Sequence, residues 1–295
     1  QADRREGWKA RPRRRRRLHR LARLFFNPRL SFYSMRRFEI FTAAAGLLLS
    51  TTIGAGVFAL PYLAERSGWG TVFGYLALLS VIVIFAHILY FKVLETTNER
   101  RRLVGLVGEH LGSRMTPTAI IAVVGGLLFS LVAYLVLAGE FVRFIVPTAG
   151  GVGSVAVFWL AATLPILGSL GVLVGLELAI AVLMVVMILG IFLFGGDVAS
   201  LARFDVVNFS HLLLPFGAVL FSLAGWTAVE PIFDYVRRKR KDGVNLPAAL
   251  ATGTAMAAGL YALFVLGILT STGVITPDTI SGLTAWPFWK TALLG

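Results

Sequence analysis

The sequence contains no cysteine, which excludes disulfide bonds and thiolate metal sites. A zinc site is not indicated either, because the four histidines are widely spaced: His19, His87, His110 and His211. The H-E-x-x-H and G-x-S-x-G motifs are absent, and the carboxylates within the apolar segments form no pair suited to catalysis. We therefore expect neither an enzyme nor a bound metal or organic cofactor.

Charged residues are scarce, at 15% of the 295 residues, whereas 57% are hydrophobic. A soluble domain typically has about 25% charged and about 45–50% apolar residues. Long apolar runs with few charges predict an all-α integral membrane protein with several spans.

Acidic residues are the scarcer charge, with 15 Asp and Glu against 28 Lys and Arg, for a net charge of +13. Half of the basic residues precede Phe38, and the run Arg11–Arg17 is the densest. A basic segment beside a membrane span sets topology and contacts anionic lipid. We therefore predict a basic cytoplasmic tail at 1–40 and no nucleic-acid partner, although a specific RNA or protein partner for the tail stays open.

Seven apolar segments approach or exceed the roughly 20 residues that a membrane-spanning helix needs. They lie at 41–64, 71–94, 118–146, 154–171, 173–195, 211–235 and 247–271. The fourth is short and contains Pro165, and the alternative is that it forms one helical hairpin with the fifth. An eighth begins near Trp286, and we expect the chain to be a fragment of a longer protein.

The basic residues also predict the orientation of these spans. With a cytoplasmic N-terminus, 24 of the 28 Lys and Arg lie in the cytoplasmic segments 1–40, 92–117, 168–174 and 236–247. Because cytoplasmic loops are rich in Lys and Arg, this orientation is strongly favoured. We expect a multi-pass protein of the cell (inner) membrane.

Two loops have helical patterns of their own. In the cytoplasmic segment 95–115, apolar residues recur at helical spacing, which predicts a short amphipathic helix: Leu103, Leu106, Val107 and Leu111. The outer segment 196–210 is longer and mixed in composition, and we expect a short helix there.

Two spans carry helix breakers near their middle. The first contains Gly54-Ala55-Gly56, and the second, at 211–235, contains Gly225. They are five helices apart, an odd number, so they run in opposite directions. Paired interrupted helices in two halves of a chain indicate a transporter site and an inverted repeat. The alternative is that these glycines only allow close helix packing.

An interrupted helix exposes polar backbone groups at membrane depth, which is tolerated where they line a cavity or are buried in protein. Free N–H groups begin one half-helix and attract an anion, while free C=O groups end the other and attract a cation. Two such helices side by side suit a zwitterion, and free amino acids are zwitterions.

Three segments carry a resemblance to a known family. Ser50–Trp69, "STTIGAGVFALPYLAERSGW", closely resembles the first helix of amino acid permeases in the amino acid–polyamine–organocation superfamily. It is most similar to the aromatic amino acid permease and amino acid/auxin permease branches. "FSLAGWTAVEPI" at 221–232 and "LVAYLVLAGEFV" at 131–142 are similar to the sixth and third helices. The resemblance implies a leucine-transporter-like fold of two five-helix inverted repeats, with the first at 41–195 and part of the second at 211–295.

The resemblance also implies a substrate site. The backbone N–H groups of Ala55 and Gly56 would hold the substrate carboxylate, and Gly54 would give the turn. The amino group would meet carbonyl groups around the two breaks, in segments that comprise Thr52, Ile53, Phe221, Ser222 and Ala224, with Gly225 allowing the second break.

Two aromatic residues are further candidates for this site. Trp226 lies where related proteins carry residues of the substrate side-chain pocket or of a gate. The alternative is that its bulk shrinks the cavity. Tyr134 would donate its hydroxyl toward the carboxylate, the alternative being an ordinary interhelical hydrogen bond.

Ionisable residues inside a membrane are costly and are therefore functional candidates. His87 is a candidate proton relay or a packed histidine, and Glu177 faces water or an inner gate in our interpretation. Glu230 and Asp234 lie beside a basic loop and are expected to form gate or loop ion pairs.

These features together predict a secondary active transporter of a neutral or aromatic amino acid, working by alternating access. Proton coupling is favoured by the family, with sodium coupling or exchange left open. The alternative is a membrane-embedded amino acid sensor or scaffold that keeps the permease fold without net transport. The oligomeric state is not indicated.

Overall fold

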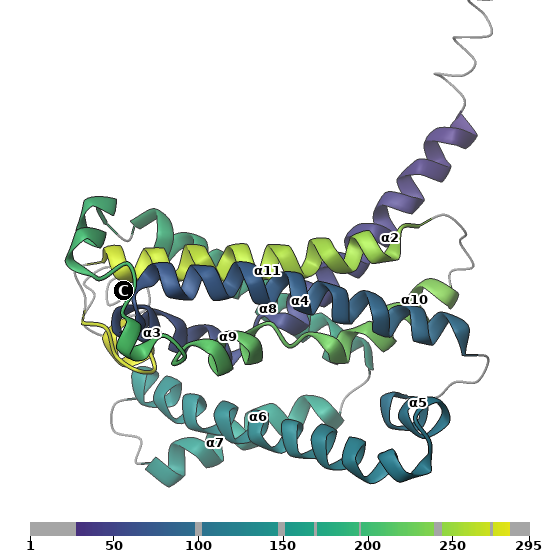
Figure 1. Cartoon of the computed structure of the whole chain (residues 1–295), viewed down its shortest axis with the longest axis horizontal. Helices are drawn as coiled ribbons and strands as arrows, with labels where there is room; N and C mark the ends of the chain where they lie inside the picture. The colour runs from purple at the N-terminus through teal and green to yellow at the C-terminus, as the bar shows by residue number, and fades with distance from the viewer. Residues whose placement is uncertain are drawn as a thin grey trace, which may run out of the picture.

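Figure 1 shows the computed structural model of the chain, which describes residues 28–97, 102–146, 151–167, 170–194, 196–238, 244–271 and 274–283. All regular structure in these residues is helical, so the all-α expectation is confirmed for them. The α-helices are α2 (Pro28–Thr52), α3 (Leu60–Ser67), α4 (Trp69–Thr96), α5 (Leu103–His110), α6 (Thr116–Ile145), α7 (Gly151–Thr163), α8 (Leu170–Phe194), α9 (Phe216–Ser222), α10 (Val229–Arg238), α11 (Leu246–Thr270) and α12 (Ile280–Leu283). The 3-10 helices are η1 (Ala55–Ala59), η2 (Ser113–Met115), η3 (Leu164–Leu167), η4 (Val198–Arg203), η5 (Phe209–His211) and η6 (Trp226–Ala228).

Five helical segments of the described chain have the length and apolarity to cross a membrane. Four are Trp69–Thr96, Ser113–Val142, Phe216–Arg237 and Leu246–Thr270. The fifth is the pair Arg37–Thr52 and Ala55–Ser67, whose halves meet at an angle of 53°. They match the predicted spans 41–64, 71–94, 118–146, 211–235 and 247–271.

The predicted fourth span differs from the structure. In place of a helix over 154–171, α7 has 13 residues and is followed by the 3-10 helix η3, which contains Pro165. Proline has no backbone N–H to continue an α-helix, so the helix ends before it. The fifth predicted span, 173–195, is helical as α8, but its apolar part within the described residues, Ala179–Phe194, is shorter than the five membrane-spanning segments. The predicted eighth span near Trp286 and the segment 1–27 of the basic tail lie outside the described residues.

Helix α11 lies at the centre of the packing. It contacts α2, α4 and α8, and Figure 1 shows it beside α4 along the long axis of the molecule. Half of its most apolar stretch is buried, whereas none of that of α6 is. Large apolar side chains of α6, such as Ile121 and Phe129, are exposed, as expected of a face that meets lipid.

Both predicted loop helices are present. Helix α5 buries Leu106, although Leu111 lies beyond its end and is exposed. The segment 196–210 contains η4, and η5 begins at its end. This segment is tied to the connection between α3 and α4, because the N–H of Gly70 donates to the carbonyl of Val206 at 2.9 Å and that of Asn208 to Ser67 at 2.8 Å.

Candidate functional site

The first break separates α2 from η1. The α-helix ends at Thr52, and Gly54 has an extended backbone (φ −146°, ψ −163°) before η1 begins at Ala55. The N–H groups of Ala55 and Gly56 are the first of this helix and therefore have no acceptor within it. The predicted interruption of the first span is confirmed.

The second break separates α9 from η6. Helix α9 ends at Ser222, and a tight turn follows in which the N–H of Ala224 donates to the carbonyl of Phe221 at 3.2 Å. The N–H of Gly225 donates to the carbonyl of Leu223 at 2.8 Å. The second predicted interruption is thus also present. The carbonyl of Phe221 already accepts one hydrogen bond, from the N–H of Ala224 in this turn.

The two breaks pack against each other reciprocally. A Cβ atom added to Gly56 would lie 2.9 Å from the Cα of Ser222, the last residue of α9. A Cβ atom added to Gly225 would overlap the hydroxyl of Thr52, the last residue of α2. Real Cβ atoms do not approach other atoms so closely, so both glycines are required by this contact. Each helix end therefore rests on the glycine of the opposite break.

Tyr134 of α6 reaches the first break. A Cβ atom on Gly54 would lie 2.5 Å from the Tyr134 hydroxyl, so this hydroxyl sits against the turn. The structure thus brings Tyr134 to the segment that was predicted to hold the carboxylate.

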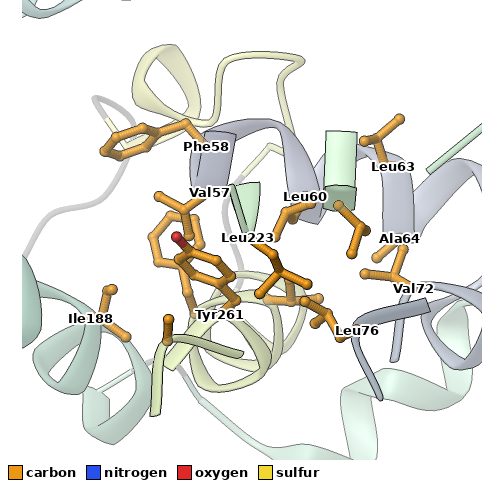
Figure 2. Packing of buried hydrophobic residues seen from close by; sticks show 14 of the residues in the cluster. Val57, Phe58, Leu60, Leu63, Ala64, Val72, Leu76, Ile188, Leu223 and Tyr261 are labelled. Atoms are coloured by element: carbon orange, nitrogen blue, oxygen red, sulfur yellow. The ribbon is translucent and has the colours of Figure 1, made fainter. Parts of the chain in front are cut away.

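Tyr261 of α11 also belongs to the site, and sequence reasoning missed it. Its hydroxyl lies 2.6 Å from the carbonyl oxygen of Thr52 and 2.9 Å from that of Ser222. Figure 2 shows its ring within the apolar core, between Val57, Leu223 and Ile188. The signal available in the sequence was a hydroxyl group in the middle of an otherwise apolar span.

The site has one buried side and one accessible side. Tyr261 is fully buried (0% exposed), whereas Tyr134 is 42% and Phe221 38% exposed. Ala224 is exposed and Trp226 is half-buried in η6. The side chain of Ile53 belongs to the apolar core, so only its backbone faces the break.

His87 of α4 lies deep in the helix packing, 2% exposed, and its Nδ1 is 3.1 Å from the hydroxyl oxygen of Thr254. That hydroxyl is also 3.1 Å from the carbonyl of Leu250. Both bonds form when Thr254 donates to Leu250 and the N–H at Nδ1 of His87 donates to Thr254. The other relay candidate, Glu177, lies in α8, and its side chain is outside the described part.

Glu230 of α10 joins the second interrupted helix to α4 and α5. Its carboxylate accepts hydrogen bonds from the hydroxyl of Tyr90, from the N–H of Leu103 at 3.1 Å and from Arg102 at 3.2 Å. The predicted ion pair of Glu230 is confirmed, and its partner Arg102 precedes α5. No ion pair of Asp234 is found within the described residues.

The N–H of Leu103 is the first of α5 and has no acceptor inside that helix. The Glu230 carboxylate fills this role from another helix, and its negative charge suits the positive end of the α5 dipole. Glu230 therefore caps α5 while tying it to α10 and α4.

Comparison with known proteins gives one match. Residues 40–270 match the model of the family described as transmembrane amino acid transporter protein. No curated protein and no solved structure matches the chain. The match covers most of the chain, including both breaks, α4, α6 and α11. The chain therefore belongs to the transmembrane amino acid transporter family, and it is a multi-pass membrane protein.

Proposed function

We propose that this protein is a secondary active transporter that moves a neutral or aromatic amino acid across the membrane by alternating access. The family accounts for amino acid transport in general. The observation that carries the proposal is the reciprocal packing of the two interrupted helices, which brings the ends of α2 and α9 and the start of η1 to one place.

The charges of these backbone groups suit the two ends of an amino acid. The N–H groups of Ala55 and Gly56 offer donors to a carboxylate, with the Tyr134 hydroxyl beside them at Gly54. The carbonyl groups of Thr52 and Ser222 end two helices, where the helix dipole favours a positive charge. A zwitterion therefore matches the site, whereas a plain anion or cation satisfies half of it.

The chemical nature of the substrate side chain is inferred from the exposed residues near the two breaks. The ring of Phe221 lies 3.1 Å from a Cβ atom added to Gly56, Trp226 follows Gly225 directly in the sequence, and aromatic surfaces favour apolar and aromatic groups. This supports a neutral, bulky amino acid as the substrate.

We propose proton coupling with His87 as the relay, because it is a titratable group held within the membrane span by Thr254. Sodium coupling is the competing mechanism. We also propose a cytoplasmic N-terminus, with the basic tail on anionic lipid of the inner membrane, and the distribution of Lys and Arg supports this orientation.

The test is uptake of labelled amino acids by proteoliposomes that carry the purified full-length protein. Neutral and aromatic amino acids are supplied outside, under an inward proton gradient, an inward sodium gradient or neither. We expect concentrative uptake that the proton gradient stimulates. Binding of an amino acid without any uptake or exchange would contradict transport and indicate a sensor or scaffold.

A further inference from the structure

The hydroxyl of Tyr261 joins the two interrupted helices although Tyr261 belongs to neither. It comes from the continuous helix α11 and lies within hydrogen-bonding distance of the carbonyl groups of Thr52 and Ser222, at 2.6 and 2.9 Å. These residues are the last of α2 and the last of α9.

At this point the hydrogen-bond acceptors outnumber the donors. A tyrosine hydroxyl has one proton to donate, but two carbonyl oxygens face it. Each carbonyl ends a half-helix and has lost its helical N–H partner, and each carries the negative end of a helix dipole. One hydroxyl proton therefore serves two negative helix ends, and a second donor with positive charge is favoured beside it.

In the transport cycle proposed above, that second donor is the ammonium group of the amino acid. An ammonium group has three N–H donors and satisfies both carbonyls on the loaded carrier. When no amino acid is bound, Tyr261 is the donor that the structure provides to both helix ends. Because Tyr261 is fully buried, water does not readily take its place.

We propose that Tyr261 is a positioning residue that takes the place of the substrate ammonium group on the empty carrier. This inference rests on the proposed transport function. By bridging the ends of α2 and α9, the hydroxyl keeps the two half-helices together while the unloaded site returns across the membrane. Net transport needs this return step, whereas exchange of internal for external amino acid does not.

The experiment compares net uptake with exchange for the variant Tyr261→Phe in proteoliposomes, at equal pH and salt on both sides. Phenylalanine keeps the ring and removes the hydroxyl. Loss of one buried hydrogen bond corresponds to about a tenfold effect on the step that depends on it. We expect net uptake per folded protein to fall by that amount, while exchange stays near the wild-type rate and KM does not rise.

The matched control is Tyr75→Phe, which removes a hydroxyl from α4, where the Tyr75 ring contacts Phe216 edge-on with centroids 6.0 Å apart. Both rates should stay at the wild-type level in this control. An equal fall of net uptake and exchange in folded Tyr261→Phe protein would overturn the proposal, because a merely structural hydroxyl lowers both. Unchanged rates would overturn it as well.

The wild-type protein provides a second measurement that does not depend on the folding of the variant. If Tyr261 supports the empty return, wild-type net uptake should proceed at a rate comparable with exchange. A wild-type protein that exchanges but performs no net uptake would overturn the proposal. A wild-type protein without any amino acid flux would contradict the transport function itself, which separates the two failures.

Discussion

Gly225 lies directly against the hydroxyl of Thr52, so that the break in one membrane helix closes on the end of the other. A Cβ atom at this glycine would also lie 3.1 Å from Cδ1 of Leu48. The variant Gly225→Ala is therefore expected to destabilise the protein by about 1–3 kcal/mol through overpacking. The measurement is thermal unfolding of the purified protein.

A double-mutant cycle makes this prediction specific. Thr52→Ala removes the hydroxyl that the new Cβ would strike, so the double variant should lose less stability than the two single variants added together, by about 1 kcal/mol. Gly217→Ala is the control, because nothing lies within 4 Å of a Cβ there and alanine favours the helix. Additive losses would show that the two residues are not in contact.

The Glu230 network predicts unequal effects for its two charged members. Arg102 is 87% exposed whereas Glu230 is 18% exposed, so their ion pair contributes little on its own. Glu230→Ala removes the acceptor of Tyr90 and of the first N–H of α5. We expect it to speed hydrogen exchange in Leu103–His110 markedly, while Arg102→Ala changes exchange there only slightly. Equal effects of the two variants would refute the capping role of Glu230.

The contact of His87 with Thr254 links the proposed relay to the central helix α11. His87→Gln removes the titratable ring, and we expect it to abolish the stimulation of uptake by an inward proton gradient while exchange continues. Thr254→Val leaves the ring in place without its partner, and we expect a loss of about 1–3 kcal/mol in stability. Proton stimulation that survives in His87→Gln would exclude His87 as the relay.

The absence of cysteine allows a direct test of topology, because any introduced thiol is the only one. Ser113→Cys lies after α5 on the predicted cytoplasmic side, and Ser210→Cys lies in η5 on the predicted outer side; both positions are exposed. A membrane-impermeant maleimide should label Ser210→Cys in intact cells and Ser113→Cys only after permeabilisation. The reverse pattern would place the N-terminus outside.

The positions of the breaks follow from local rules and were predictable. Glycine removes the side chain and favours irregular backbone, so the interruptions at Gly54 and Gly225 were predicted, whereas the end of α7 before Pro165 was not, because a span was expected to continue through it. The amphipathic spacing of α5 was visible for the same reason. These features depend on neighbours in the sequence and need no knowledge of tertiary packing.

The residues that join separate helices were harder to predict. The hydroxyl of Tyr261 meets Thr52 across 209 positions and Ser222 across 39. The acid at Glu230 reaches Leu103 across 127 positions, although a cluster of basic residues follows it directly in sequence. Such partners are set by how the spans pack, and one sequence does not specify this packing.

The central claim is that the two packed breaks form the amino acid site. It is tested most directly by the uptake of a labelled neutral amino acid by Gly56→Leu, with Gly46→Leu as the matched control in the same span. A leucine at position 56 would enter the backbone of Ser222, whereas nothing lies within 4 Å of a Cβ at Gly46. We expect the Gly56→Leu variant to insert into the membrane but to transport nothing, while the Gly46→Leu variant transports normally. Normal transport by Gly56→Leu would contradict it.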